Sequence, residues 1–236
     1  MALPKLATPE FETTLPSTGE RVVFRPFLMK EEKVLLIALE GGESSDIVRA
    51  VENIIDSCII HPDTLQAKNL PFFDLEYMFL NIRAKSVNEI ITVHIRHSEE
   101  NQACEHIEKV EINIDDIKVN GEQGDMVIML TDTVGVEMVY PTIATAQQFA
   151  DLKTSTDVLE ALTSCIKCVF DGDEVVSDYT KLELNDWIST FSSEQVQKLN
   201  EFFEKMPTLS YDVDWVCEEC GVKEHTELRG LLSFFM

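Results

Sequence analysis

The hydrophobic periodicity of the chain changes twice, and these changes most constrain its fold. From about residue 30 to residue 88 apolar residues recur at helical spacing, as do Leu75, Met78, Phe79 and Ile82. From Glu89 to about residue 140 they alternate with polar residues, which is typical of half-buried strands. After Pro141 the helical spacing returns. The pattern therefore predicts an α+β fold in which helical portions surround a small antiparallel sheet.

The chain is expected to have three successive portions. The first, residues 1–88, should hold a β-hairpin around the turn Pro16–Gly19, followed by helices that begin near Lys30, Asp46 and Pro71. The second, residues 89–140, should hold one small antiparallel sheet. The third, residues 141–236, should be helical and end in a short β-element that carries a Cys-x-x-Cys pair.

The elements expected in the second and third portions follow from the same patterns. Strands are predicted at residues 91–95, 110–114, 126–130 and 134–139. Helices are predicted at residues 144–152, 157–168, 182–191 and 193–203, with a Gly-centred turn at residues 170–175.

The charge of the chain excludes some classes of partner. With 19 Lys+Arg against 43 Asp+Glu, the formal net charge is −24. Nucleic acids and anionic membranes both attract basic proteins, so we expect this chain to bind neither. Disorder is the other common reading of such acidity, but 44% hydrophobic residues, among them 13 Phe, can form a core.

The sequence shows no sign of a membrane span or of secretion. No apolar run approaches the roughly 18 to 20 residues that a span requires, and the first residues lack the apolar stretch of a signal peptide. We therefore expect a soluble cytosolic protein whose six cysteines are reduced.

Two Cys-x-x-Cys pairs suggest a metal site. Cys217 and Cys220 are followed by Gly221, as in zinc knuckles where a tight turn presents two thiolates. Cys165 and Cys168 could complete four ligands, although the two pairs are farther apart than the roughly fifteen to twenty residues usual in a zinc ribbon. The open alternatives are a site that Cys217 and Cys220 form with His225 or a partner chain, and plain reduced cysteines.

A second group of metal-binding residue types lies in the middle portion. His97, Cys104 and His106 would converge at the loop of a hairpin if the flanking strands pair, and could form a small zinc site there. Ordinary polar loop residues are the alternative. One structural zinc ion is thus the only cofactor that the sequence suggests.

No catalytic motif is evident. The chain has no Gly-rich phosphate-binding loop and no Gly-x-Ser-x-Gly nucleophile motif. We therefore expect that the protein is not an enzyme.

Five segments, taken together, resemble one family. They are residues 3–9 with 15–19, residues 24–33, residues 73–80, residues 82–87, and Cys217–Gly221. In this order they are similar to the small baseplate-hub proteins of T4-like (T-even-type) contractile-tailed bacteriophages, over nearly the whole chain.

The resemblance implies a late, non-enzymatic role in building the viral tail. It implies a hub subunit, or a hub-assembly factor acting as a chaperone, that contacts other hub proteins and the tape-measure protein. Such a protein would work in the host cytoplasm during assembly and would be found in the tail baseplate if it stays in the virion. The alternative function is a zinc-binding regulatory or adaptor protein of the host cytosol.

Two segments are candidates for contact with partners. Arg25 and Phe27 belong to types favoured at interfaces, but Arg25 can also pair with neighbouring glutamates at a strand-to-helix junction. Phe234 and Phe235 lie in an apolar C-terminal segment that forms either a docking peptide or part of the core.

Overall fold

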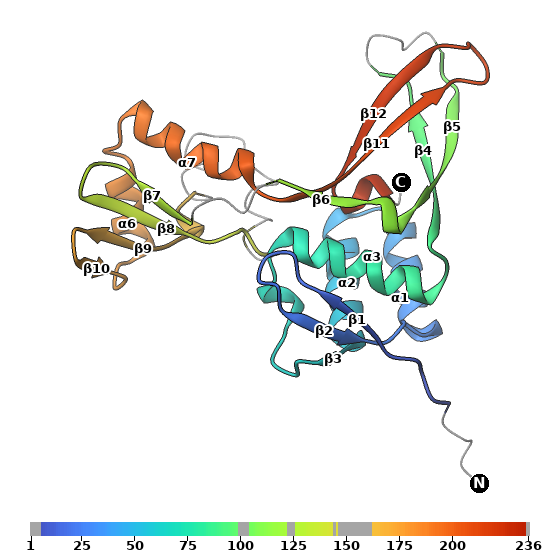
Figure 1. The fold of residues 1–236 in the computed structure, drawn as a ribbon, viewed down its shortest axis with the longest axis horizontal. Coiled ribbons are helices and arrows are strands. Elements are labelled where there is room, and N and C mark those ends of the chain that lie inside the picture. The colour runs from blue at the N-terminus through green and yellow to red at the C-terminus, as the bar shows by residue number, and fades with distance from the viewer. Residues whose placement is uncertain (1–5, 99–103, 122–125, 144, 146–161, 235–236) are drawn as a thin grey trace. The chain divides into compact units, whose positions relative to one another are not determined.

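Helix α3 (Phe72–Ser86) is surrounded by other elements on most of its circumference. The computed structural model describes residues 6–98, 104–121, 126–143, 145 and 162–234. Nine residues of α3 are buried: Phe73, Asp74, Leu75, Glu76, Met78, Phe79, Leu80, Ile82 and Ala84. A helix buried on several faces lies at the centre of a core, and Figure 1 shows α3 in that position.

A three-stranded antiparallel sheet contacts α3. It consists of β1 (Phe11–Thr14), β2 (Arg21–Phe24) and β3 (Ile59–His61) in that order. The Thr13 hydroxyl donates to the Tyr77 hydroxyl at 3.1 Å, and the Ser17 N–H donates to the Asp74 carboxylate at 3.0 Å. The buried Asp74 thereby connects the β1–β2 turn to the helix.

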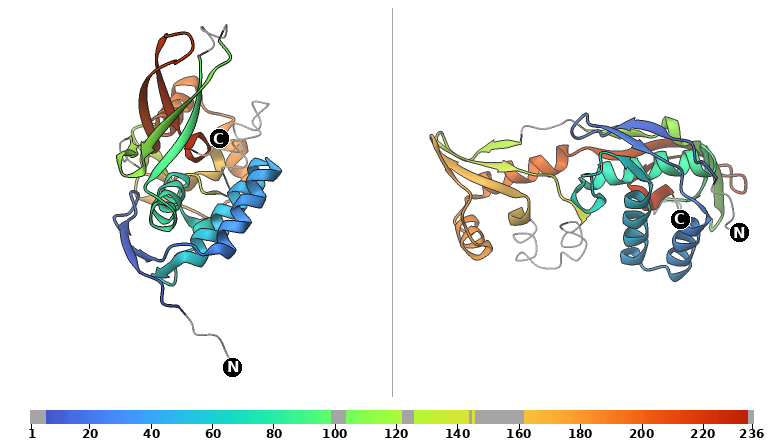
Figure 2. Two further views of the ribbon diagram at one scale, coloured as in Figure 1. Left: turned by 90° about the vertical axis from the view of Figure 1, so that its right-hand side faces the viewer. Right: turned by 90° about the horizontal axis from the view of Figure 1, so that it is seen from below.

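Two helices precede α3 and lie side by side, as the right-hand view of Figure 2 shows. They are α1 (Met29–Gly41) and α2 (Ser44–Cys58). Helix α1 ends where Gly42 adopts a φ of 74°, a left-handed conformation that glycine adopts without strain, and the Gly42 N–H donates to the Ala38 carbonyl.

Two β-hairpins belong to the same compact unit as α1, α2 and α3, and they lie beside each other in Figure 1. Strand β4 (Ile90–Arg96) pairs with β5 (Ile107–Asn113), and β11 (Thr208–Val216) pairs with β12 (Lys223–Arg229). The short strand β6 (Lys118–Asn120) adds to the outer edge of β11. Among the described residues, two short 3₁₀ turns follow the paired strands, η3 (Ile114–Asp116) after β5 and η4 (Leu231–Phe234) after β12, and a third, η1 (Ala67–Asn69), precedes α3.

The chain divides into two compact units. The first comprises residues 1–67, 73–120 and 208–236, and the second comprises residues 68–72 and 121–207. Each unit draws on more than one of the three portions expected from the sequence.

The second unit is built on a four-stranded antiparallel sheet with the order β10-β9-β8-β7. The strands are β7 (Val127–Met129), β8 (Val134–Met138), β9 (Ile166–Asp171) and β10 (Glu174–Val176), and two helices follow, α6 (Lys181–Ile188) and α7 (Ser193–Lys205). Gly135 lies opposite Phe170, whose ring occupies the space that a side chain at residue 135 would need.

The α+β class and the C-terminal hairpin are confirmed, but two predictions about elements are wrong. The four strands expected to form one sheet lie in separate sheets, because β8 pairs with β7 and β9 rather than with β4 or β5. The helix expected at residues 157–168 ends before Ile166, where β9 begins, because Ile166, Val169 and Phe170 favour strands and their segment pairs with β8. The helix expected at residues 144–152 lies outside the described residues except for Thr145. Among the described residues, no helix is long and apolar enough to cross a membrane.

Arg25 connects the start of α1 to the end of α2. Its guanidinium donates to the Glu31 carboxylate at 2.9 Å and to the Ser57 carbonyl at 2.8 Å. The side chains of Arg25 and Glu31 are only 17% and 7% exposed. Burial would raise the pKa of Glu31, but hydrogen bonds from Arg25, the Leu28 N–H and Lys30 outweigh it and hold that pKa below its usual value.

We expect Arg25→Ala to lower the free energy of unfolding by about 3 kcal/mol at pH 7, because it removes the buried cation paired with the largely buried Glu31 carboxylate and leaves that carboxylate with only the exposed Lys30 and the Leu28 N–H. Urea denaturation followed by circular dichroism measures this change. Because the folded-state pKa of Glu31 is depressed, the stabilisation is present above the unfolded pKa of about 4.3 and is lost as the pH falls through the folded value. The difference in the free energy of unfolding between Arg25→Ala and the wild type should therefore become smaller at acidic pH.

Arg21→Ala is the matched control, because Arg21 pairs with Glu12 on the surface and should contribute little. Equal losses of stability in the two variants would contradict the importance of the Arg25 pair.

Candidate metal centre

The tips of the two neighbouring hairpins bring four metal-binding side chains together. His97 follows β4 and Cys104 lies shortly before β5, while Cys217 and Cys220 lie in the turn between β11 and β12. Their ligand atoms all lie within 4.8 Å of one another. Residues far apart in the sequence thus form one cluster within the first compact unit.

The β11–β12 turn is closed by its own backbone. The Cys217 N–H donates to the Val222 carbonyl at 3.0 Å, and the Gly221 N–H donates back to the Cys217 carbonyl at 2.9 Å. Gly221 has a φ of 73°, which a residue with a side chain rarely adopts. The Cys-x-x-Cys-Gly sequence therefore forms the tight turn that its residue types predict.

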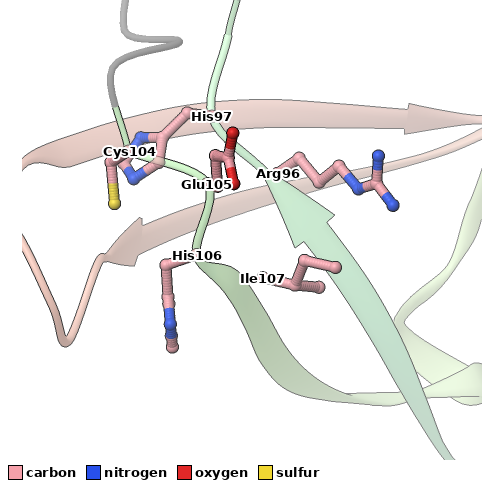
Figure 3. A pocket seen from close by; sticks show the side chains of 6 residues that line it. All are labelled: Arg96, His97, Cys104, Glu105, His106 and Ile107. Atoms are coloured by element: carbon pink, nitrogen blue, oxygen red, sulfur yellow. The ribbon is translucent and has the colours of Figure 1, made fainter.

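The other two residues of the cluster, His97 and Cys104, line an open pocket of about 520 Å³. It is lined by Arg96, His97, Cys104, Glu105, His106 and Ile107. Figure 3 shows the His97 ring close to the Cys104 side chain, whereas the Arg96 and Ile107 side chains point away from them. Arg96 pairs with Ile107 at the end of the β4–β5 ladder, and this pairing brings His97 and Cys104, which lie just beyond it, close together.

The cysteines of the cluster are not joined by a disulfide bond. The Cys104 and Cys217 sulfurs are 3.8 Å apart, and the Cys220 sulfur is 3.4 Å from His97 Nε2. A disulfide requires a sulfur separation of about 2.05 Å, so these cysteines are free thiols.

The His97 ring is held by its other nitrogen. Nδ1 lies 2.7 Å from a Glu224 carboxylate oxygen, and the second oxygen accepts from the Ser98 N–H at 3.0 Å. The ring centre lies 5.0 Å from that of Trp215, and the His97 side chain is 2% exposed. With the proton on Nδ1 facing the carboxylate, Nε2 presents its lone pair toward Cys220.

The surroundings shift the pKa values of two cluster members in opposite directions. The hydrogen bond to Glu224 raises the pKa of His97, and Cys217 adds to this effect. The backbone N–H of Cys220 lowers the pKa of Cys217 to about 6 despite its burial, with help from His97 and the Glu219 N–H. Cys217 therefore tends toward the thiolate, which is the form that binds metals.

A second group of possible ligands overlaps the first. His106, Glu108 and Cys217 also have ligand atoms within 4.8 Å of one another. His106 lies 3.5 Å from carboxylate oxygens of Glu108 and Glu219, and Glu108 accepts from the Glu218 N–H at 3.1 Å. These groups surround the four-residue cluster with hydrogen bonds and negative charge.

Comparison with known proteins places the chain in a family. The family model described as T4 bacteriophage base plate protein matches residues 8–236. The chain belongs to this family. No curated protein and no solved structure matches it.

In this base plate protein, each of the two groups proposed from the sequence contributes two residues to the cluster. Cys217 and Cys220 come from one group, and His97 and Cys104 come from the other. His106 belongs only to the overlapping group. His225 is largely exposed and pairs with Asp212 and Asp214.

Cys165 and Cys168 belong to the second compact unit and to neither cluster found among the described residues. Burial raises the pKa of Cys165 to about 11 and also raises that of Cys168, whose thiol donates to Glu137 at 3.3 Å. Both are therefore neutral thiols near neutral pH, as expected of cysteines that pack in a core.

The residues suggested as partner contacts lie mainly in the interior. Phe27 and Phe234 are buried, and Arg25 forms the junction between β2, α1 and α2 described above. Phe235 lies outside the described residues. The structure thus matches the alternatives of a strand-to-helix junction for Arg25 and a core position for Phe234.

Sequence reasoning missed both the grouping of the ligands and their supporting residues. Glu224 and Trp215 orient His97 but stand out in no local motif. One signal was available: each predicted group has residues of metal-binding types close together at a turn, and either turn alone offers fewer than the four ligands of a closed zinc site. Combining the halves requires knowing which hairpins are neighbours.

Proposed function

We propose that this base plate protein is a subunit or assembly factor of the baseplate hub and works by binding other hub proteins and the tape-measure protein, without catalysis. The observation that carries the proposal is the family match over residues 8–236. The order of the five sequence segments supports the hub in particular. The protein would act in the host cytoplasm during tail assembly and as part of the virion if it is retained.

The outer surface of α1 offers a place for such contacts. Leu35 and Ala38 are buried, yet Val34, Leu36 and Ile37 on the remaining surface are about half exposed. A helix that is apolar on most of its circumference is normally buried on most of it. In a baseplate assembly, a second hub protein would cover this surface.

The negative charge of the chain also suits a protein that assembles with others. A net charge of −24 keeps the free protein dispersed and attracts partners with basic surfaces. The metal cluster by itself suits a zinc-binding adaptor equally well, so it is the family membership that favours the baseplate.

The first test is co-purification. Co-expression of the full chain with the phage hub and tape-measure proteins should yield a stable complex on size-exclusion chromatography. Consistent failure to co-purify with any of them would contradict the proposal.

A pair of matched variants tests the α1 surface in that complex. Leu36→Glu should weaken binding at least about tenfold, because it places an unpaired charge in a buried contact. Leu182→Glu makes the same change at an exposed leucine of α6 and should bind as wild type does. Equal affinities of the two variants, measured by calorimetry, would exclude α1 as the contact surface.

Charge attraction predicts a dependence on salt. The rate constant of association with the hub partner should fall steeply as the ionic strength rises, while the dissociation rate changes little. Stopped-flow or surface plasmon resonance measures both rates. An association rate that does not change with salt would show that charge does not steer assembly.

A further inference from the structure

We propose that His97, Cys104, Cys217 and Cys220 together bind one Zn²⁺ ion, and that this ion fastens the tip of the β4–β5 hairpin to the tip of the β11–β12 hairpin. The inference concerns the stability of the fold and is independent of the proposed hub function.

The distances within the cluster agree with a tetrahedral zinc site. With Zn–S bonds of about 2.3 Å and Zn–N bonds of about 2.05 Å, a tetrahedron separates two sulfurs by about 3.8 Å and a sulfur from a nitrogen by about 3.6 Å. The observed separations are 3.8 Å between Cys104 and Cys217, and 3.4 Å between Cys220 and His97 Nε2. These two separations match a tetrahedral site, and the remaining pairs of ligand atoms lie within 4.8 Å of one another.

The ligand types select the metal and its role. Three cysteines and one histidine form one of the common ligand sets of structural zinc, and thiolates disfavour Mg²⁺ and Ca²⁺. The site supplies four protein ligands, so its coordination sphere is closed and no position remains for a substrate.

The supporting contacts are those of a metal-bound histidine. Zinc-binding histidines usually donate their second N–H to a carboxylate or carbonyl, which fixes the ring. Glu224 occupies this position at 2.7 Å from Nδ1 and is itself held by the Ser98 N–H. The nitrogen that faces the sulfurs is thereby the one left free for the ion.

The electrostatics of the cluster also favour a bound cation. Glu108 and Glu224 lie close to the cluster, and neither is strongly exposed. Three thiolates beside these carboxylates would repel one another, whereas a divalent ion offsets two of the three thiolate charges. The chain as a whole carries a large excess of negative charge, which makes local compensation by a metal more favourable.

The ion would join elements that backbone pairing leaves separate. The β4–β5 pair and the β12-β11-β6 sheet are distinct sheets. Their tips contact through side chains, as between His97 and Glu224 and between Glu108 and the Glu218 N–H. Zinc would add four strong bonds at this point, two from each hairpin.

The test measures zinc in the untagged full-length protein, purified under reducing conditions, by inductively coupled plasma mass spectrometry. We expect one zinc per chain in the wild type, and less than a tenth of that in Cys104→Ser and in Cys217→Ser. Cys168→Ser is the matched control and should retain all of its zinc, because Cys168 lies outside the cluster.

Two results would overturn the proposal. One is wild-type protein without zinc that also fails to take up added Zn²⁺. The other is loss of zinc from Cys168→Ser with full retention in Cys104→Ser, which would place the metal on the other cysteine pair.

Because a cysteine substitution can lower the zinc content simply by unfolding the chain, a second measurement uses the wild-type protein. After removal of zinc with a chelator, added Co²⁺ should produce the intense visible absorption of a tetrahedral thiolate site, and one equivalent of Zn²⁺ should abolish it. The melting temperature should fall on chelation and recover with Zn²⁺. A weak octahedral Co²⁺ spectrum, or a melting temperature unaffected by chelation, would contradict the site.

Discussion

The contact between two hairpin tips is the interaction on which the candidate metal centre depends. Glu224 of one hairpin holds His97 of the other, and the nitrogen left free faces Cys220. Because the four ligands come from sites more than a hundred residues apart, the cluster exists only when both hairpins have formed and met. Such a contact closes a long loop, whose entropy cost a metal bond can offset.

The remainder of the first unit places these hairpins. Helix α3 forms the centre of the core, and β4 begins a few residues after it ends. The 3₁₀ turn that follows β12 contacts both β4 and β12, and it buries Phe234. The C-terminal segment thus helps to hold the two hairpins together, which is why Phe234 is a core residue rather than a free docking anchor.

The sequence predicted what local chemistry determines. The first three helices begin close to their expected residues, since apolar spacing and an acidic first turn are local signals. The turn at Cys217–Gly221 likewise follows from its own residues. Pairing between distant strands left no such signal: β6 pairs with β11 across about ninety residues, and no local pattern indicates this. The same limit explains why the sequence suggested two separate metal sites, one of four cysteines and one of His97, Cys104 and His106, and not the cluster that takes two residues from each.

The most direct test of the central claim is X-ray absorption spectroscopy at the zinc edge on the wild-type protein. A site formed by His97, Cys104, Cys217 and Cys220 should give a first coordination shell of three sulfur atoms at about 2.3 Å and one nitrogen at about 2.05 Å, with the outer-shell scattering of a single imidazole. A shell of four sulfurs, or one dominated by oxygen, would contradict the assignment of His97, Cys104, Cys217 and Cys220 as the ligands.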